Sequence, residues 1–180
     1  MRSLRVRVLF GGGVVGSEVE QFRSRGRYTV IPRTLVFLTN GDDVLLLKGA
    51  PTKRLWANRH NGLGGHVEPG ETIVAAALRE VWEEAGIAAG AIEGFGLRAL
   101  VNVEGEPQGV LLCIFTGVAR TRAVVGSAEG TPEWVPVARL GEIDLVDDDR
   151  LLPRLLGEDG VLFGHQRLGA DGSLAAFTLE

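Results

Sequence analysis

Three glutamates in one stretch of the chain have the spacing needed to bind a divalent cation. Glu80, Glu83 and Glu84 lie within the segment Gly65–Ile87, and Thr72–Ala85 has the pattern of a helix. At 100° per residue, their side chains fall within an arc of about 100° on such a helix. Carboxylates held this close repel one another unless a cation lies between them, and hard oxygen ligands favour Mg²⁺ or Mn²⁺. The spacing therefore predicts a magnesium site, for which Mn²⁺ is a possible substitute.

A glycine-rich stretch, Gly62–Gly70, leads into this helix. Glycine lets the backbone approach a neighbouring group closely, so a backbone carbonyl could complete the metal coordination. Thr72 is a suitable N-cap and Gly86 a suitable C-terminal stop. Apolar residues at helical spacing predict the face that packs on the core. These residues are Val74, Ala77, Leu78, Val81 and Ala85.

The elements around the helix are predicted to be mostly strands. Strands on both sides of one long helix predict an α/β or α+β domain with a mixed sheet. The second helix would begin in acidic residues, and the last two strands would form a C-terminal hairpin. The predicted strands are Thr29–Leu38, Val44–Lys48, Gly96–Val103, Gly109–Val118, Thr131–Val137, Val161–Leu168 and Leu174–Leu179, and the second helix is Asp148–Leu156.

Composition limits the classes of protein and of partner. The 180 residues suggest one domain, residues 29–180, preceded by a flexible, basic and glycine-rich extension, residues 1–28. A net charge of −4 argues against a nucleic-acid polymer as partner, and the longest apolar stretch, Gly109–Val118, is too short to cross a membrane. The single cysteine, Cys113, fits a core position in a cytoplasmic protein. The chain is expected to be a monomer or a homodimer.

The segment that carries the glutamates resembles the signature of a known family. Its fixed positions are Gly65, Glu71, Arg79, Glu80, Glu83, Glu84 and Gly86. This pattern resembles the box of the Nudix hydrolases, whose fold is an α/β/α sandwich with a mixed central sheet. The resemblance implies that the three helical glutamates bind Mg²⁺ with help from the carbonyl of Gly64 or Gly65. One of them, or a glutamate outside the box, would orient or deprotonate the attacking water, and Arg79 would pair with Glu71 to support the carboxylates.

The wider chain, from about Tyr28 to Glu180, resembles the MutT-like 8-oxo-dGTP diphosphatases. Matching segments include Thr34 in the opening strand and the run from Asn61 through Leu63, Gly64, Gly65 and His66, which the resemblance assigns to substrate binding. In that branch an asparagine and an acid pair contact the purine edge, which implies these roles for Asn61, Asp147 and Asp148. The alternatives are that Asn61 supports a glycine turn and that the two acids cap the second helix.

The sequence differs from the family pattern two positions before the acid pair of Asp147 and Asp148. Leu145 stands where the best-known members have an aromatic residue that stacks on the purine. Trp56, in the longer loop Gly49–His60, could supply this stacking, whereas Trp82 and Trp134 are predicted to belong to the core.

Two further positions have open roles. Lys48 either binds a phosphate or is an exposed residue at a strand end. Glu129, in a glycine loop, is the preferred further metal ligand or base, although Glu133 competes for that role and an exposed loop acid is equally compatible with the pattern.

The preferred interpretation is an Mg²⁺-dependent pyrophosphohydrolase that converts a nucleoside triphosphate, specifically an oxidised purine nucleotide, to a monophosphate and pyrophosphate. Alternatives are a Nudix hydrolase of an ADP-sugar, a dinucleoside polyphosphate or an RNA 5′ end. An inactive nucleotide sensor is disfavoured, because all the glutamates of the box are present.

Overall fold

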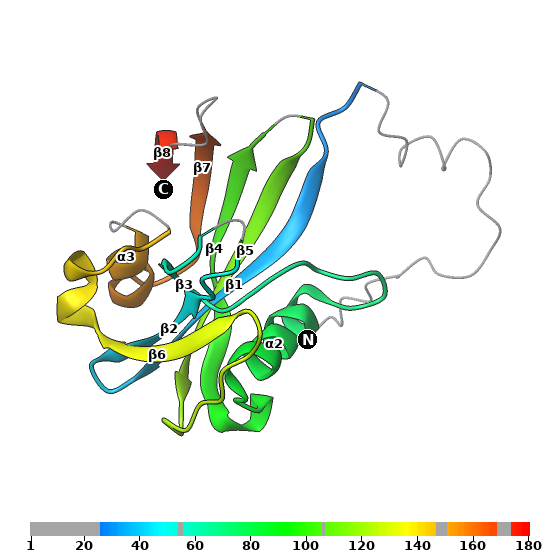
Figure 1. Ribbon diagram of the computed structural model, residues 1–180. Helices are drawn as coiled ribbons and strands as arrows, with labels where there is room; N and C mark the ends of the chain where they lie inside the picture. The colour runs from blue at the N-terminus through cyan, green and yellow to red at the C-terminus, as the bar shows by residue number, and fades with distance from the viewer. Residues whose placement is uncertain (1–25, 54–55, 106, 147–150, 169–173) are drawn as a thin grey trace, which may run out of the picture.

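The computed structural model describes residues 26–53, 56–105, 107–146, 151–168 and 174–180 (Figure 1). Most of the expected N-terminal extension, together with Asp147 and Asp148, lies outside these residues. The strands are β1 Val30–Asn40, β2 Asp43–Gly49, β3 His60–Asn61, β4 Ile92–Glu104, β5 Gly109–Ala119, β6 Gly130–Pro136, β7 Leu162–Leu168 and β8 Leu174–Leu179. The helices are α2 Ile73–Ala85 and α3 Leu151–Gly157, with short 3₁₀ turns η2 Ala89–Ala91 and η3 Val137–Glu142.

The strands form one mixed sheet. Its order is β3-β2-β1-β5-β4-β7-β8, and β6 pairs with β2. The centre is the long parallel pair of β1 and β5, which runs from Val30 opposite Gly109 to Thr39 opposite Val118. β4 and β5 are antiparallel, and β7 and β8 form the C-terminal hairpin that the sequence predicts.

The segment between β3 and α2 lies between two strands that separate. β1 and β2 pair only near their turn, from Leu38 opposite Leu45 to Asn40 opposite Asp43. Farther along, β2 pairs with β3, whereas β1 forms bridges to Leu63 and His66. Residues 60–66 therefore fill the gap between β1 and β2, and this pairing fixes the glycine-rich loop before α2.

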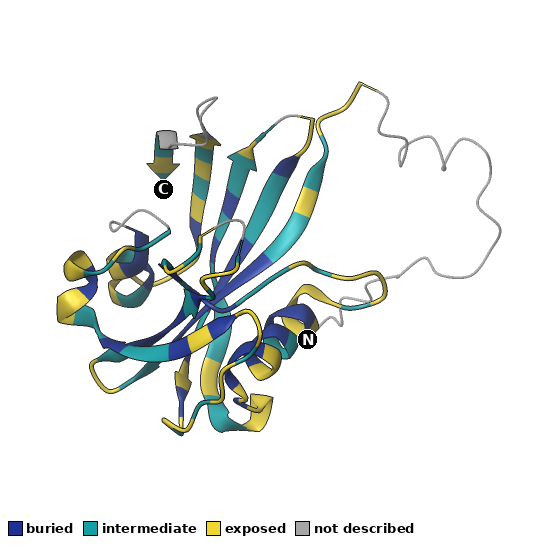
Figure 2. Ribbon diagram, viewed as in Figure 1, coloured by how far each residue is buried: buried dark blue, intermediate teal, exposed yellow. Residues whose placement is uncertain are grey.

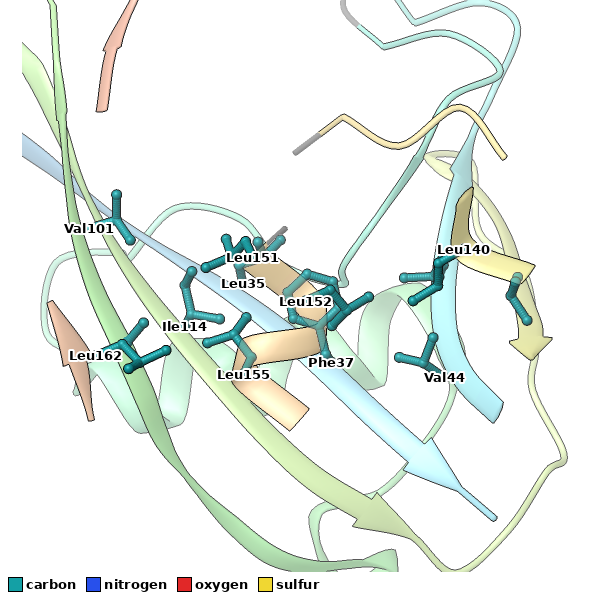
Figure 3. Packing of buried hydrophobic residues seen from close by; sticks show 13 residues of the cluster. Leu35, Phe37, Val44, Val101, Ile114, Leu140, Leu151, Leu152, Leu155 and Leu162 are labelled. Atoms are coloured by element: carbon teal, nitrogen blue, oxygen red, sulfur yellow. The ribbon is translucent and has the colours of Figure 1, made fainter. Parts of the chain in front are cut away.

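Both faces of the sheet are covered, which gives the α/β/α sandwich (Figure 1). Along β1, Leu35 and Phe37 belong to the core beneath α3, whereas Val36 and Leu38 belong to the core beneath α2. Successive side chains of a strand point to opposite faces, so a strand buried on both sides is a continuous apolar run. Figure 3 shows the α3 side, where leucines of α3 pack against the sheet, and Figure 2 shows the buried residues concentrated along the central strands.

The ends of α2 are those that the sequence predicts. The Thr72 hydroxyl accepts a hydrogen bond from the N–H of Ala75 at 3.1 Å, and Gly86 ends the helix at a φ of 70°. The buried face, however, differs from the predicted one. Val74 and Trp82 are 47% and 59% exposed, so the expectation that they belong to the core is wrong.

The buried face of α2 includes the carboxylates of Glu80 and Glu84 beside Ala77 and Val81. Val74 lies in the first turn of α2, where Ile73 and Ala75 are exposed as well. Trp82 lies on the side of the helix away from the buried face. Trp134 is partly buried against the α2-side core, as expected. None of the helices in the described part of the chain is long and apolar enough to cross a membrane.

Candidate active site

The glycine loop packs directly on the buried carboxylates of α2. The N–H of Gly64 donates to Glu84 Oε2 at 2.7 Å. A Cβ on Gly64 would lie 2.2 Å from the carbonyl oxygen of Thr34, and its φ of +150° also favours glycine. A Cβ on Gly65 would lie 2.3 Å from Glu80 Oε1. The two glycines thus provide the close approach that the sequence predicts, each to a different glutamate.

The environment of these glutamates disfavours their charged forms. Glu84 is 2% exposed and Glu80 is 8% exposed. Burial raises the pKa of Glu84 to about 8, although the hydrogen bond from Gly64 opposes the shift, and the charges of Glu129 and Glu80 raise it further. Burial also raises the pKa of Glu80, while Arg79 opposes that rise. Two buried carboxylates with raised pKa values are arranged to gain from a nearby cation.

Arg79 bonds to three carboxylates, those of Glu71, Glu80 and Glu83. Its Nη2 and Nε donate to the two carboxylate oxygens of Glu71 at 2.9 and 3.2 Å, which confirms the predicted pair. This bidentate bond, together with the backbone N–H of Glu68, lowers the pKa of Glu71. Arg79 Nη1 also donates to Glu80 and Glu83, each at 2.9 Å. Arg79 therefore holds the acidic face of α2 to the loop that precedes it.

Glu129 approaches the same carboxylates from outside the helix. It lines a cleft together with Glu80 and Glu84, and its charge raises the pKa values of both. Lys53 Nζ lies 3.0 Å from Glu129 Oε2. Glu133, the competing candidate, instead lies 3.0 Å from Nε2 of the buried His60 and is not among the described residues that line the cleft.

The acidic side chains of the described site are bonded to other parts of the chain and are not gathered around one point. No three His, Cys, Asp or Glu side chains among the described residues are gathered closely enough to hold a metal ion. Each carboxylate has a partner from the chain: Glu80 and Glu83 bind Arg79, Glu84 accepts from Gly64, and Glu129 pairs with Lys53. Glu83 is half-exposed and does not line the described cleft. The donor set, which consists of carboxylates and backbone oxygens, nevertheless fits a hard divalent cation.

The cleft has a volume of about 790 Å³, which suits a nucleotide-sized ligand. It brings together most of the residues that the sequence assigned to substrate binding. Asn61 lines it, and its Oδ1 accepts from the N–H of Gly62 at 2.8 Å, so it supports the glycine turn as well. The other predicted residues that line it are Thr34, Gly64, Gly65, His66 and Leu145. The Thr34 hydroxyl is buried and has no hydrogen-bond partner among the described residues.

Two residues assigned to substrate binding lie elsewhere in the described structure. Leu63 is fully buried in the α2-side core, and its backbone pairs with Val36. Lys48 lies within β2, opposite His60 and Thr131, and is not among the residues that line the cleft. The cleft instead has Lys53, Trp56 and Arg59 from the following loop. The sequence does not predict that Arg59 lines the cleft, because a single arginine in a polar loop belongs to no recognisable pattern.

A family model for the NUDIX domain matches residues 30–155, more than half of the chain. The chain belongs to the Nudix family. It is a Nudix hydrolase, an enzyme that acts on diphosphate bonds. It is 30% identical over 147 residues to a Mus musculus protein named oxidized purine nucleoside triphosphate hydrolase, a match that covers 82% of this chain and 92% of the relative.

Solved structures agree with this assignment. The crystal structure of the MutT protein of Bacillus halodurans superposes with a TM-score of 0.65 at 25% identity, covering 84% of this chain and 98% of that one. The Nudix domain of Shewanella oneidensis NrtR, solved with ADP ribose, superposes with a TM-score of 0.64 at 13% identity and shows the common fold alone; 81% of this chain and 98% of that one are covered.

Proposed function

We propose that this Nudix hydrolase cleaves an oxidised purine nucleoside triphosphate into a nucleoside monophosphate and pyrophosphate, with Mg²⁺ as its cofactor. The observation that carries the proposal is the placement of Glu80, Glu84 and Glu129 in one cleft that also contains base-sized aromatic and apolar side chains. The similarity to the Mus musculus oxidized purine nucleoside triphosphate hydrolase over most of both chains supports this choice of substrate.

The ligands of the cation would be the carboxylates of Glu80, Glu83, Glu84 and Glu129 and one backbone carbonyl. We assign the carbonyl to Gly64, because that of Gly65 already accepts a hydrogen bond from the N–H of Thr34 at 2.9 Å. When bound, Mg²⁺ neutralises charge on the diphosphate oxygens and lowers the pKa of a water molecule. Glu129 lines the same cleft as Glu80 and Glu84 but belongs to a different segment of the chain, which suits it to orient the attacking water.

The other side of the cleft would hold the nucleoside. Asn61 retains an amide NH₂ that can donate to a purine oxygen or nitrogen while its Oδ1 accepts from Gly62. Trp56 and Leu145 offer the surfaces on which a base can pack. The proposed purine-edge roles of Asp147 and Asp148 fall outside the described residues.

The phosphates require cationic groups. Lys53 lines the cleft beside Glu129, whereas Lys48 does not line it. We therefore propose Lys53 as the lysine that binds a phosphate, in place of Lys48. In this structure Glu129 pairs with the ammonium group of Lys53. When the metal ion is bound, Glu129 would coordinate the cation instead, and the ammonium group of Lys53 would be free to bind a phosphate.

Product analysis tests this proposal. With Mg²⁺, 8-oxo-dGTP should yield 8-oxo-dGMP and pyrophosphate, and Glu84→Gln should lower kcat by at least about 100-fold through loss of a metal-centred electrostatic interaction. Glu93→Gln removes an exposed glutamate that pairs with Arg120 and serves as the control. Release of inorganic phosphate in place of pyrophosphate, or near-normal turnover in Glu84→Gln, would refute the proposal.

A further inference from the structure

One wall of the cleft is a short segment that is attached to β3. Leu145 forms a parallel bridge with His60. The N–H of His60 donates to the carbonyl of Asp144 at 2.8 Å, and the N–H of Val146 donates to the carbonyl of His60 at 2.8 Å. Leu145 and Val146 both line the cleft. Because two backbone hydrogen bonds connect residues 144–146 to β3 in the described part of the chain, the position of this segment depends on additional contacts.

The side chain of Arg59 supplies those contacts. Its Nε donates to Asp144 Oδ1 at 2.9 Å, and its Nη2 donates to the carbonyl of Leu145. An exposed ion pair contributes little by itself. Here, however, the planar guanidinium binds a side chain and the next backbone carbonyl together, which fixes the orientation of both.

The backbone of Arg59 bonds to a second part of the cleft lining, the turn that contains Trp56. Its N–H donates to the carbonyl of Trp56 at 3.1 Å, and its carbonyl accepts from the N–H of Gly49 at 3.0 Å. Trp56 has a φ of 61° in this turn, a conformation that needs support from neighbouring bonds. Trp56 and Leu145, the two surfaces available to a base, are therefore both bonded to Arg59.

We propose that Arg59 is a positioning residue that sets the separation between Trp56 and Leu145 and thereby determines base selectivity. The inference rests on the proposed function only for the nature of the ligand. Arg59 acts through the residues that it holds, because its guanidinium is already bonded to Asp144 and Leu145.

Hydrogen exchange tests the structural half of the proposal without any substrate. Arg59→Lys keeps the charge but lacks the planar fork. The amides of His60 and Val146 should exchange about 10-fold faster in this variant, whereas the amides of α2 keep their rates. Arg139→Lys, which alters an exposed arginine–glutamate pair in η3, is the matched control. Unchanged exchange at His60 and Val146 would overturn the proposal.

Steady-state kinetics test the selectivity half. In Arg59→Lys the ratio of kcat/KM for dGTP to that for dCTP should fall about 10-fold, mainly through the KM for dGTP, with kcat within about threefold of the wild type. Asp144→Asn should shift the ratio in the same direction, and the double variant should show less than the combined effect. Equal losses on both nucleotides would overturn the proposal.

The proposal would also be overturned if Arg59→Lys lowered the ratio of kcat/KM for dGTP to that for dCTP and Asp144→Asn did not. Arg59 would then contact the substrate directly. If the wild-type enzyme hydrolyses no nucleoside triphosphate, the proposed function fails, and the hydrogen-exchange result still decides whether Arg59 holds the segment.

Discussion

Replacing Glu84 by glutamine should stabilise the metal-free protein at neutral and alkaline pH. Glu84 is almost fully buried, and burial raises its pKa to about 8 from the ordinary value of 4.5 for a glutamate. The unfolded chain releases this proton near pH 4.5, whereas the folded chain holds it until about pH 8. The folded state therefore binds more protons across this window, and its stability falls as the pH rises through it.

The size of the effect follows from the pKa difference. Each pH unit within the window costs about 1.4 kcal/mol for one group, so the loss between pH 4.5 and pH 7 has an upper bound of about 3 kcal/mol. A glutamine at this position has no titratable proton, and its amide oxygen can still accept the hydrogen bond from Gly64. Glu84→Gln should therefore match the wild type near pH 4.5 and exceed its stability increasingly up to pH 8.

Urea unfolding followed by tryptophan fluorescence in EDTA, from pH 4.5 to pH 9, measures this difference. Glu83→Gln removes the same charge from a half-exposed position of α2 and is the control. Mg²⁺ binds only the folded state and therefore stabilises it. Saturating Mg²⁺ should stabilise the wild type more than Glu84→Gln, because the variant lacks one of the proposed carboxylate ligands. Stability curves for wild type and Glu84→Gln that run parallel across the whole pH range would refute the burial argument.

The remaining predictions concern the glycine loop and the lysines. Gly64→Ala should destabilise the fold by at least about 2 kcal/mol in urea unfolding, because the new Cβ meets the backbone of Thr34 at a positive φ. Gly65→Ala should leave the unfolding midpoint close to that of the wild type but weaken Mg²⁺ binding about 10-fold in a calorimetric titration, since its Cβ displaces only the flexible carboxylate of Glu80; normal Mg²⁺ affinity would contradict this. Lys53→Met should lower kcat/KM about 10-fold through loss of a charge-assisted phosphate contact, whereas Lys48→Met should change it little; the reverse order would restore Lys48 as the phosphate ligand.

Much of the fold could be predicted from the sequence, because its strands are buried on both faces. Runs such as Leu35–Leu38 and Val44–Leu47 are continuous and apolar, and each supplies alternate residues to the two cores. Thr72 and Gly86 mark the ends of α2 by local capping chemistry, which needs no tertiary information. The resemblance to the Nudix box likewise implied the pair of Arg79 and Glu71, which the structure contains.

The parts that could not be predicted depend on contacts between distant segments. Trp82 was assigned to the core by its type, but it lies on the side of α2 away from the buried Glu80 and Glu84 and is exposed. Lys53 was separable from Lys48 only after β2 and the loop that follows it were placed in space. Arg59 bonds residues more than 80 positions away, and no local pattern encodes such a contact.

We propose that this Nudix hydrolase prefers oxidised purine nucleoside triphosphates to other nucleotide substrates. Measuring kcat/KM with Mg²⁺ for 8-oxo-dGTP, dGTP, ADP-ribose and a diadenosine polyphosphate under identical conditions tests it most directly. The proposed cleft predicts that 8-oxo-dGTP has the highest kcat/KM, with dGTP lower by about 10-fold or more through unpaired polar groups at the base. A higher kcat/KM for ADP-ribose or the diadenosine polyphosphate would contradict the claim and leave only the family assignment standing.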